Sequence, residues 1–538
     1  MIIRRYLSLQ VLGSTASVAL VLTVILMSGR VIKYFGMAAD GRMDVKLLTA
    51  VLLYRLPGFL ELIVPLGMFI AILLVFGRLY LDNEMAVLSA SGVSRAQIVG
   101  HLALPVLIAQ LALMGNAVID TAMAGRLSAT DLASVGIAAS IQATVLMSLV
   151  SVLLALPPII AHLHGGGRHA EIGQEIHQSA WISFALSLIA ILLLCFPEPF
   201  ISISHLQPQV EAKVRAYLSA SAFGVPAVFA QRIFFGLSTG IGRPRPVMLF
   251  NLLSLSLKVP LNALFMHGLL GAPKMGGPGC AVATALDAWL IAFLAWSWCL
   301  QNKNYLAFNM RRRFAPPDLK AIAEFLKLGI PIGLTFIADV TAFTFMALFI
   351  ARLGPVASGA HQIAANLAAL AFMVPLAIGN ATSVLAGQNI GAGLNARARH
   401  ACWEGIRMGM GIAVVVSSLF WFFSPNIAAL YTTDHEVQKL AIPLIRLVAL
   451  YHLADALQAV AVNALRGYKK SVAPMLIYAT LLWGMGLGGG ILLGLTDRFG
   501  PARGAPGFWI AAIASLWLVA GLIALYLNAV SQAKSRAG

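Results

Sequence analysis

The chain has 538 residues, of which 60% are hydrophobic and only 11% are charged, and its mean hydropathy is +0.87. Ordinary soluble domains carry about 25% charged residues, so this composition excludes a water-soluble protein. The net charge of +17 does not indicate a nucleic-acid partner, because the basic residues lie in short loops between apolar segments rather than on one soluble face.

The first hundred residues contain two apolar segments near 8–29 and 57–80. Each is long enough to cross a bilayer as a helix, which takes about 20 residues. Arg4 and Arg5 precede the first segment, but no small-residue cleavage site follows it. We therefore expect a retained membrane helix rather than a signal peptide.

The remainder of the chain contains twelve more apolar segments of membrane-spanning length. They lie near 103–124, 138–162, 179–199, 217–237, 246–266, 279–299, 329–351, 361–386, 403–424, 440–463, 473–495 and 507–528. If the amino terminus is cytoplasmic, the cytoplasmic loops hold about twice as many Lys and Arg residues as the opposite loops. This bias predicts a multi-pass protein of the cell inner membrane with both termini in the cytoplasm.

The larger part of the chain shows an internal repeat. A register of near-constant offset pairs Pro105 with Pro331, Gly165 with Gly391 and, one residue later, Gly240 with Gly467. Two halves of six spans in the same orientation predict two bundles related by a pseudo-two-fold axis along the membrane normal, with a central cavity between them. The predicted fold is therefore an all-α polytopic membrane protein with twelve spans in two six-helix bundles and two extra amino-terminal spans.

The repeat also divides the chain. We expect the two-span fragment at 1–99, the first bundle at 100–300, a cytoplasmic linker at 301–327, the second bundle at 328–530 and a cytoplasmic tail at 531–538. The chain contains no GxxxxGK[ST] phosphate loop, and its four cysteines have neither CxxC spacing nor companion histidines. We therefore expect a transporter rather than an enzyme, with no cofactor and with an ion gradient or a partner as its energy source.

Several motifs of this part resemble the multidrug and toxic compound extrusion (MATE) family, and the resemblance extends over about 101–530. The motifs are Leu104-Pro105-Val106-Leu107, Ile119-Asp120-Thr121-Ala122-Met123-Ala124-Gly125, Val259-Pro260-Leu261-Asn262, Ala360-His361-Gln362-Ile363-Ala364 and Leu465-Arg466-Gly467-Tyr468. The similarity is greatest to the NorM-like branch. It implies cation coupling at acidic residues of the first, seventh and tenth spans, here Asp120, Asp339 and Asp455, with Na⁺ at Asp339 and Asp455 if sodium is the coupling ion. Asp339 departs from the pattern, which has Glu there, and the shorter side chain leaves the cation preference open.

The residues support this interpretation on their own, because a carboxylate at bilayer depth normally faces a cavity, a cation or a partner. Asp287 is also intramembrane, and it either faces a cavity or pairs with Lys258. Asn262, His361, Gln362 and Tyr451 are further candidates for lining the cavity, although a structural hydrogen bond would also explain His361 and Gln362. Four aromatic side chains are candidates for stacking on cationic aromatic substrates: Tyr451, Phe336, Phe343 and Trp483. Packing is the usual role of such residues.

The first hundred residues resemble a different family, the F/G permease subunits of the lipopolysaccharide export transporter. The resemblance rests on Met1-Ile2-Ile3-Arg4-Arg5-Tyr6-Leu7 and on the acidic segment Leu81-Asp82-Asn83-Glu84-Met85-Ala86-Val87-Leu88. In those permeases the acidic segment is a cytoplasmic coupling helix that meets an ATPase, and Glu84 is the matching position. The other permease spans are absent here, so we expect no lipopolysaccharide transport and no ATPase partner. A natural fusion and an error in gene assembly both explain the junction.

Three functions remain open at this stage. The first is efflux of amphipathic, often cationic drugs and toxic compounds by antiport with Na⁺ or H⁺. The second is export of a lipid-linked precursor by a flippase of the same superfamily, which a basic cavity would favour. The third is a non-transporting membrane subunit that docks an ATPase through residues 82–95. The carboxylates among the candidate cavity residues favour the first.

Overall fold

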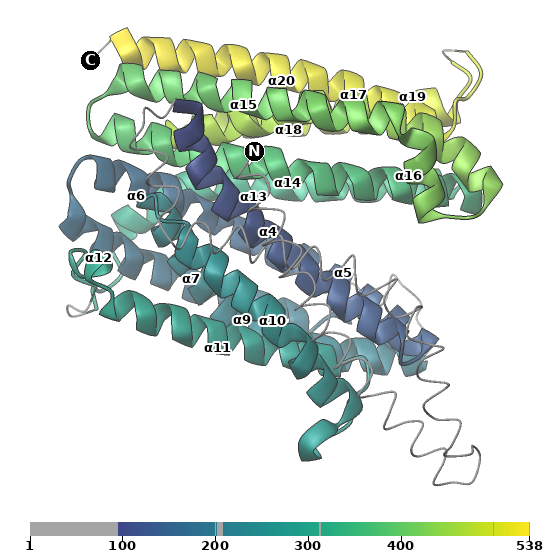
Figure 1. Ribbon diagram of the computed structural model, residues 1–538, viewed down its shortest axis with the longest axis horizontal. Helices are drawn as coiled ribbons and strands as arrows, with labels where there is room; N and C mark the ends of the chain where they lie inside the picture. Colours follow the sequence, from purple (N-terminus) through teal and green to yellow (C-terminus); the bar gives the residue numbers. More distant parts are fainter. Residues whose placement is uncertain (1–94, 199–200, 202–207, 311–313, 499, 537–538) are drawn as a thin grey trace, which may run out of the picture. The chain divides into compact units, whose positions relative to one another are not determined.

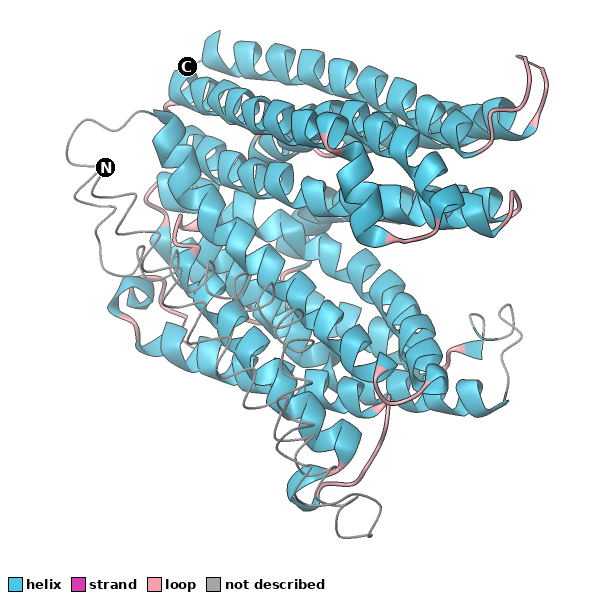
Figure 2. Ribbon diagram, turned by 45° about the vertical axis from the view of Figure 1, so that its right-hand side comes forward, coloured by secondary structure: helices cyan, strands magenta, loops and turns pink. Residues whose placement is uncertain are grey.

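The computed structural model describes residues 95–198, 201, 208–310, 314–498 and 500–536, all of which belong to one compact unit, Ser94–Gly538. The two amino-terminal spans, Glu84 and the segment before residue 95 lie outside the described residues. The described residues are almost entirely helical and join through short loops (Figure 2). Their only extended pairing is an isolated bridge between Arg498 and Gly500, so the all-α prediction is confirmed.

The described residues of the first half of this unit contain eight helices of five or more residues. They are α4 (Arg95–Gly125), α5 (Ala129–Val150), η2 (Ser151–Ala155), α6 (Leu156–Gly165), α7 (His169–Cys195), α9 (Pro208–Gly240), α10 (Arg245–His267) and α11 (Gly279–Gln301). A short turn, η3 (Leu269–Gly271), follows α10, and α12 (Lys303–Leu306) follows α11.

The second half repeats this order. Its helices are α13 (Leu319–Ala351), α14 (Pro355–Gly391), α15 (Asn395–Phe422), α16 (Ser424–Tyr431), α17 (His435–Gly467), α18 (Val472–Leu481), η4 (Leu482–Gly488), α19 (Gly489–Leu495) and α20 (Ala505–Arg536). Figure 1 shows the helices of the first half grouped in blue and teal and those of the second half grouped in green and yellow.

Twelve helices of the described part are long and apolar enough to cross a membrane, as the sequence predicted. Several begin well before the predicted apolar segment. The clearest case is α13, which begins at Leu319, inside the segment predicted as a linker, rather than at 329. Pro316 and Pro317 cannot continue a helix, and Asp318 then caps α13 by accepting a hydrogen bond from the backbone N–H of Lys320 at 2.9 Å.

Two of the spans are broken helices. The span Thr130–Gly165 passes from α5 through η2 into α6, where Pro157 and Pro158 interrupt the regular hydrogen-bond ladder. The span Val472–Leu495 contains the wide π-helical turn η4 within its glycine-rich run. Glycines beyond that turn allow close packing, because a Cβ at Gly490 would lie 2.6 Å from the ring of Phe508.

Each half has its own hydrophobic core, but the two first helices exchange their ends. Phe325, Leu328 and Ile332, near the start of α13, pack in the core of the first bundle. In the same way Ala103, near the start of α4, packs in the core of the second bundle. This reciprocal exchange is what a pseudo-two-fold relation between the halves requires.

The two bundles meet tightly where α6 contacts the carboxyl end of α14. A Cβ at Gly165 would collide with the carbonyl oxygen of Gln388, and one at Gly391 would collide with that of His162. His162 Nε2 donates to the carbonyl oxygen of Gly467 at 2.7 Å, and Gln388 Nε2 donates to that of Gly240 at 2.9 Å. The bundles are therefore sealed together at the end that carries the loops after α6, α9, α14 and α17.

Candidate functional site

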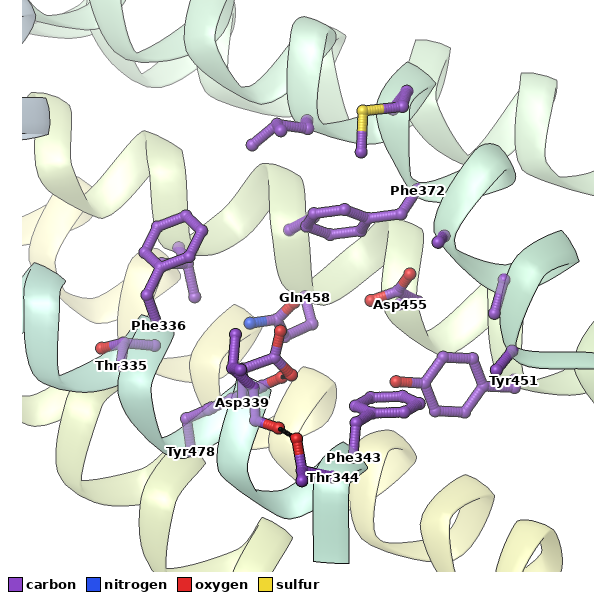
Figure 3. Close-up of a pocket in the computed structure, with 18 of the residues that line it drawn as sticks. Thr335, Phe336, Asp339, Phe343, Thr344, Phe372, Tyr451, Asp455, Gln458 and Tyr478 are labelled. Atoms are coloured by element: carbon purple, nitrogen blue, oxygen red, sulfur yellow. Dashed lines mark hydrogen bonds between the residues drawn. The ribbon is translucent and has the colours of Figure 1, made fainter. Parts of the chain in front are cut away.

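The second bundle encloses a cavity of about 470 Å³ between α13, α14, α17 and α18 (Figure 3). Its wall contains aromatic, aliphatic and polar side chains. Both predicted carboxylates of this bundle, Asp339 from α13 and Asp455 from α17, are among them. The other polar lining residues are Thr335, Thr344, His361, Gln362, Tyr451, Gln458, Asn463, Arg466 and Tyr478.

The two carboxylates have unequal surroundings. Tyr478 of α18 donates a hydrogen bond to Asp339 Oδ1 at 2.5 Å. Asp455 is only 7% exposed, and among the described residues it has no hydrogen-bond or ion-pair partner. Insertion scales give a free-energy penalty of about 3 kcal/mol for a charged carboxylate at the bilayer centre. Binding of a proton or a metal cation would remove this penalty at Asp455.

Arg466 is the only Lys or Arg among the described residues that line this cavity. It lies at the carboxyl end of α17, where its Nη1 donates to Asn463 Oδ1 at 3.0 Å and its guanidinium stacks 5.9 Å from the ring centre of Phe336. No ion pair joins Arg466 to Asp339 or Asp455 among the described residues. The two carboxylates outnumber the arginine, so the cavity attracts a further positive charge.

Aromatic rings form one side of the cavity. Phe343 and Tyr451 meet edge to face with ring centres 6.2 Å apart, and Tyr451 also lies 5.6 Å from buried Trp509. Figure 3 shows Phe336, Phe343, Phe372 and Tyr451 around the space into which Asp339 and Asp455 point. Flat apolar walls beside carboxylates suit an aromatic cation, because the ring faces and the charges attract the same ligand.

The structure brings some of the sequence-predicted residues together and separates others. His361, Gln362, Tyr451, Phe336 and Phe343 line the cavity with the two carboxylates. Trp483 does not line it: the indole is 40% exposed, and its N–H donates to the carbonyl oxygen of Ala338 at 3.1 Å. His361 is buried 5.9 Å from Trp509.

Asp120, Asn262 and Asp287 lie in the first bundle, outside this cavity. Asp120 Oδ1 accepts a hydrogen bond from Asn262 at 2.7 Å, and Asp120 Oδ2 forms an ion pair with Lys258 at 2.9 Å. The suggested pairing of Asp287 with Lys258 is therefore wrong, since Asp287 Oδ2 instead accepts from Ser254 at 2.5 Å. Asp120 on α4, rather than Asp287, pairs with the ammonium because Lys258 and Asn262 are one turn apart on α10 and both contact α4.

The sequence did not indicate Gln458, Phe372, Tyr478 or Arg466 as cavity residues. Arg466 lies beyond the predicted apolar segment 440–463, but α17 continues to Gly467 and Arg466 is only 6% exposed. A signal was available for Gln458 alone. It follows Asp455 by three residues, so both project from the same face of α17.

The cavity offers oxygen ligands from carboxylate, amide and hydroxyl groups. No group of three or more His, Cys, Asp or Glu side chains within metal-binding reach exists in the described part of the chain. Two carboxylates and the neutral oxygens of Gln458, Thr344 and Tyr451 line the same space. Such oxygen ligands suit hard cations, and a carboxylate can also bind a proton.

The family of the chain follows from comparison with known proteins. The MatE family model matches residues 105–264 and 331–489, one match in each half of the repeat. The chain is 38% identical to the probable multidrug resistance protein NorM of Chromobacterium violaceum over 82% of this chain and 95% of that protein. The chain belongs to the MATE family.

Two other relatives are similar to this chain over a comparable length. The multidrug resistance protein NorM of Vibrio vulnificus is 36% identical over 79% of this chain and 94% of its own length, and the multidrug resistance protein MdtK of Yersinia pestis is 35% identical over 79% and 94%.

Solved MATE structures share the fold. The Vibrio cholerae MATE transporter VcmN in its bent form superposes with a TM-score of 0.73 at 18% identity, over 82% of this chain and 98% of that one. A multidrug resistance MATE family transporter in an outward-facing conformation gives a TM-score of 0.75 at 17% identity, over 82% and 97%.

The amino-terminal resemblance is confirmed as well. The family model of the lipopolysaccharide export system permease LptF/LptG matches residues 5–121. This match overlaps the start of the MatE match, so the two similarities meet within α4.

Proposed function

We propose that this MATE protein exports amphipathic, mainly cationic compounds across the cell inner membrane in exchange for Na⁺ or H⁺. The observation that carries the proposal is Asp455, a buried carboxylate without a partner, which shares an aromatic-walled cavity with Asp339. The names of the relatives, multidrug resistance proteins NorM and MdtK, support the same substrate class.

Antiport requires that drug and coupling cation exclude each other. Both are positive, and both are attracted by the same pair of carboxylates in a cavity of about 470 Å³. Loading Asp339 and Asp455 with Na⁺ or protons removes the charge that holds a cationic drug. Release of the cation restores that charge, so each ligand lowers the affinity for the other.

The sealed end of the bundles supports alternating access. Contacts such as Gly165 with Gln388 close one end of the interface, and that end carries the basic loops with Arg168, Arg243 and Lys469. By the positive-inside rule we propose that this end lies in the cytoplasm, together with both termini of the chain. The structure then corresponds to a state closed toward the cytoplasm, and rocking of the bundles would open it. A ligand drives this change only through different affinities in the two states.

The competing functions receive less support. A flippase for a lipid-linked precursor needs a basic cavity for the anionic headgroup, whereas this cavity holds two carboxylates and one arginine. An ATPase-docking role would use residues 82–95, which lie almost entirely outside the described part of the chain.

Transport in proteoliposomes tests the proposal directly. We expect a fluorescent organic cation to be moved when a Na⁺ gradient or a proton gradient is imposed on purified protein, and to stay in place without a gradient. Comparing the two gradients identifies the coupling ion. Movement that is independent of both gradients, or none at all in protein that is correctly inserted, would contradict antiport.

A further inference from the structure

The first bundle contains a buried lysine in the middle of its polar network. Lys258 of α10 is only 1% exposed, and its ammonium forms an ion pair with Asp120 Oδ2 of α4 at 2.9 Å. The same ammonium donates to the hydroxyl of Thr284 on α11. Thr284 passes its own hydrogen to the carbonyl oxygen of Cys280 at 2.7 Å, so its oxygen is free to accept from Lys258.

Both oxygens of Asp120 are therefore engaged. Oδ2 faces the ammonium, and Oδ1 accepts from the amide of Asn262 at 2.7 Å. A carboxylate oxygen and a hydroxyl oxygen thus contact one positive centre, while the Asn262 amide holds the second carboxylate oxygen. Oxygen ligands around one positive charge are those of a cation site, and here the charge belongs to a side chain of the protein.

A second carboxylate adds to the same network. Ser254, one turn before Lys258 on α10, donates to Asp287 Oδ2 at 2.5 Å, and Asn116 of α4 donates to Ser254 at 3.1 Å. The remaining oxygens of Asp287 and Asn262 are buried and accept no hydrogen bond among the described residues. Without the ammonium of Lys258, this network would contain the buried carboxylates of Asp120 and Asp287 and several oxygens without a hydrogen-bond donor.

The internal repeat does not copy this arrangement. The register that pairs Pro105 with Pro331 places Met346 opposite Asp120, so the second bundle has no counterpart of the aspartate. Asp455 in turn has no lysine partner in the described part of the second bundle. One bundle thus has a carboxylate whose charge is balanced internally, and the other has a carboxylate that must take its counterion from solution.

We propose that Lys258 is a resident counterion that fills a cation site in the first bundle, so that Asp120 exchanges no ion during transport and cation loading is confined to Asp339 and Asp455. The inference rests on the proposed antiport function and assigns Asp120 a fixed charge where the family resemblance implies coupling. A tethered ammonium competes at a high effective concentration, and an incoming Na⁺ at Asp120 would leave the buried Lys258 without its carboxylate partner. An outside cation is therefore excluded while the lysine is present.

Removal of the lysine should expose this site. We expect Lys258→Asn to give the chain an additional bound cation, because Asp120, Asp287 and Thr284 remain and the shorter amide leaves room. Equilibrium binding of ²²Na⁺ to the purified full chain, with proton release on Na⁺ addition followed by a pH dye, measures it. The additional binding should vanish in the double variant Lys258→Asn/Asp120→Asn. Lys274→Asn, which makes the same charge change in a loop of this bundle, should bind like the unmodified chain.

A second measurement retains Lys258 and therefore does not depend on how Lys258→Asn folds. If Lys258 fills the first site, Asp120→Asn should keep the Na⁺ binding and proton release of the unmodified chain, whereas Asp455→Asn should lose them. Equal losses in Asp120→Asn and Asp455→Asn, or no additional binding in folded Lys258→Asn, would overturn the resident-counterion proposal. Unchanged binding in Asp455→Asn would instead overturn the proposed function, so the two failures are distinguishable.

Discussion

The hydroxyl of Tyr478 donates a hydrogen bond to Asp339 Oδ1 across 2.5 Å, so a side chain of α18 holds the carboxylate of α13. Asp455 of α17 lines the same cavity without such a donor among the described residues. The two carboxylates that we expect to bind the coupling cation are therefore not equivalent, and the phenol can compete with the cation for Asp339.

Tyr478→Phe tests this competition. The change removes only the hydroxyl, and a hydrogen bond to a charged group contributes about 1.5–3 kcal/mol. Without the hydroxyl, no hydrogen-bond donor competes with the cation for Asp339, so we expect about tenfold tighter Na⁺ or proton binding. Efflux should be slower, because release of the cation becomes rate-limiting. Cation binding and initial efflux rates measure the two effects. Tyr526→Phe on α20, outside the cavity, is the control. Weaker cation binding in Tyr478→Phe would show that the phenol assists rather than competes.

Asp455→Asn and Asp339→Asn should each abolish gradient-driven efflux while the protein still inserts. An amide has the size of a carboxylate but cannot bind and release a proton or balance the charge of Na⁺. Efflux of a fluorescent cation from cells, at matched amounts of membrane protein, measures the loss. The control is Asp434→Asn, because Asp434 is an exposed cap of α17 and asparagine caps a helix equally well. Normal efflux by both cavity variants would remove the proposed site.

The sequence predicted the spans and the repeat well because both depend on patterns that extend over hundreds of residues. Asp339 and Asp455 were also predicted as cavity residues, since carboxylates at bilayer depth are rare enough to stand out. The partner of Lys258 was not predictable in the same way. Asp120 and Asp287 come from different helices, α4 and α11, and only the rotation of those helices about α10 decides which carboxylate meets the ammonium.

The contribution of Tyr478 was hidden for a related reason. It lies on a separate helix from both carboxylates, and a tyrosine in an apolar span usually packs against lipid or core. The early start of α13 escaped prediction because hydropathy marks where a helix enters the bilayer, whereas Asp318 marks where the helix begins. Patterns of one helix could be interpreted from the sequence, but contacts between helices required the structure.

Deletion of residues 1–98, with a new initiating Met, should leave most drug efflux intact. The MatE match begins at residue 105, and the two predicted spans of the fragment return the chain to the side from which α4 starts, so their loss does not invert the remaining spans. Efflux by the truncated and full chains at equal membrane abundance provides the comparison. A truncated protein that inserts correctly but does not transport would give the permease-like fragment a functional role.

Gly165→Ala should destabilise the state that is closed at the α6–α14 contact. The new Cβ would collide with the backbone carbonyl of Gln388, which cannot move as a side chain tip can. Overpacking costs about 1–3 kcal/mol, and each 1.4 kcal/mol changes a population about tenfold, so the bundles should separate at this end. If transport needs both closed and open states, efflux should fall even though the glycine lies outside the cavity of Asp339 and Asp455.

The separation can be measured with spin labels on cysteines that replace exposed Arg168 and Arg397, in a chain whose four native cysteines have been substituted. Gly165→Ala should shift the distances between the labels to longer values. Gly136→Ala on α5 is the matched control, because its Cβ would meet nothing within 4 Å, and it should leave both distances and efflux unchanged. Distances and efflux in Gly165→Ala that match those of the control would show that this contact does not hold the bundles closed, and the alternating-access interpretation of the sealed end would then lose its structural basis.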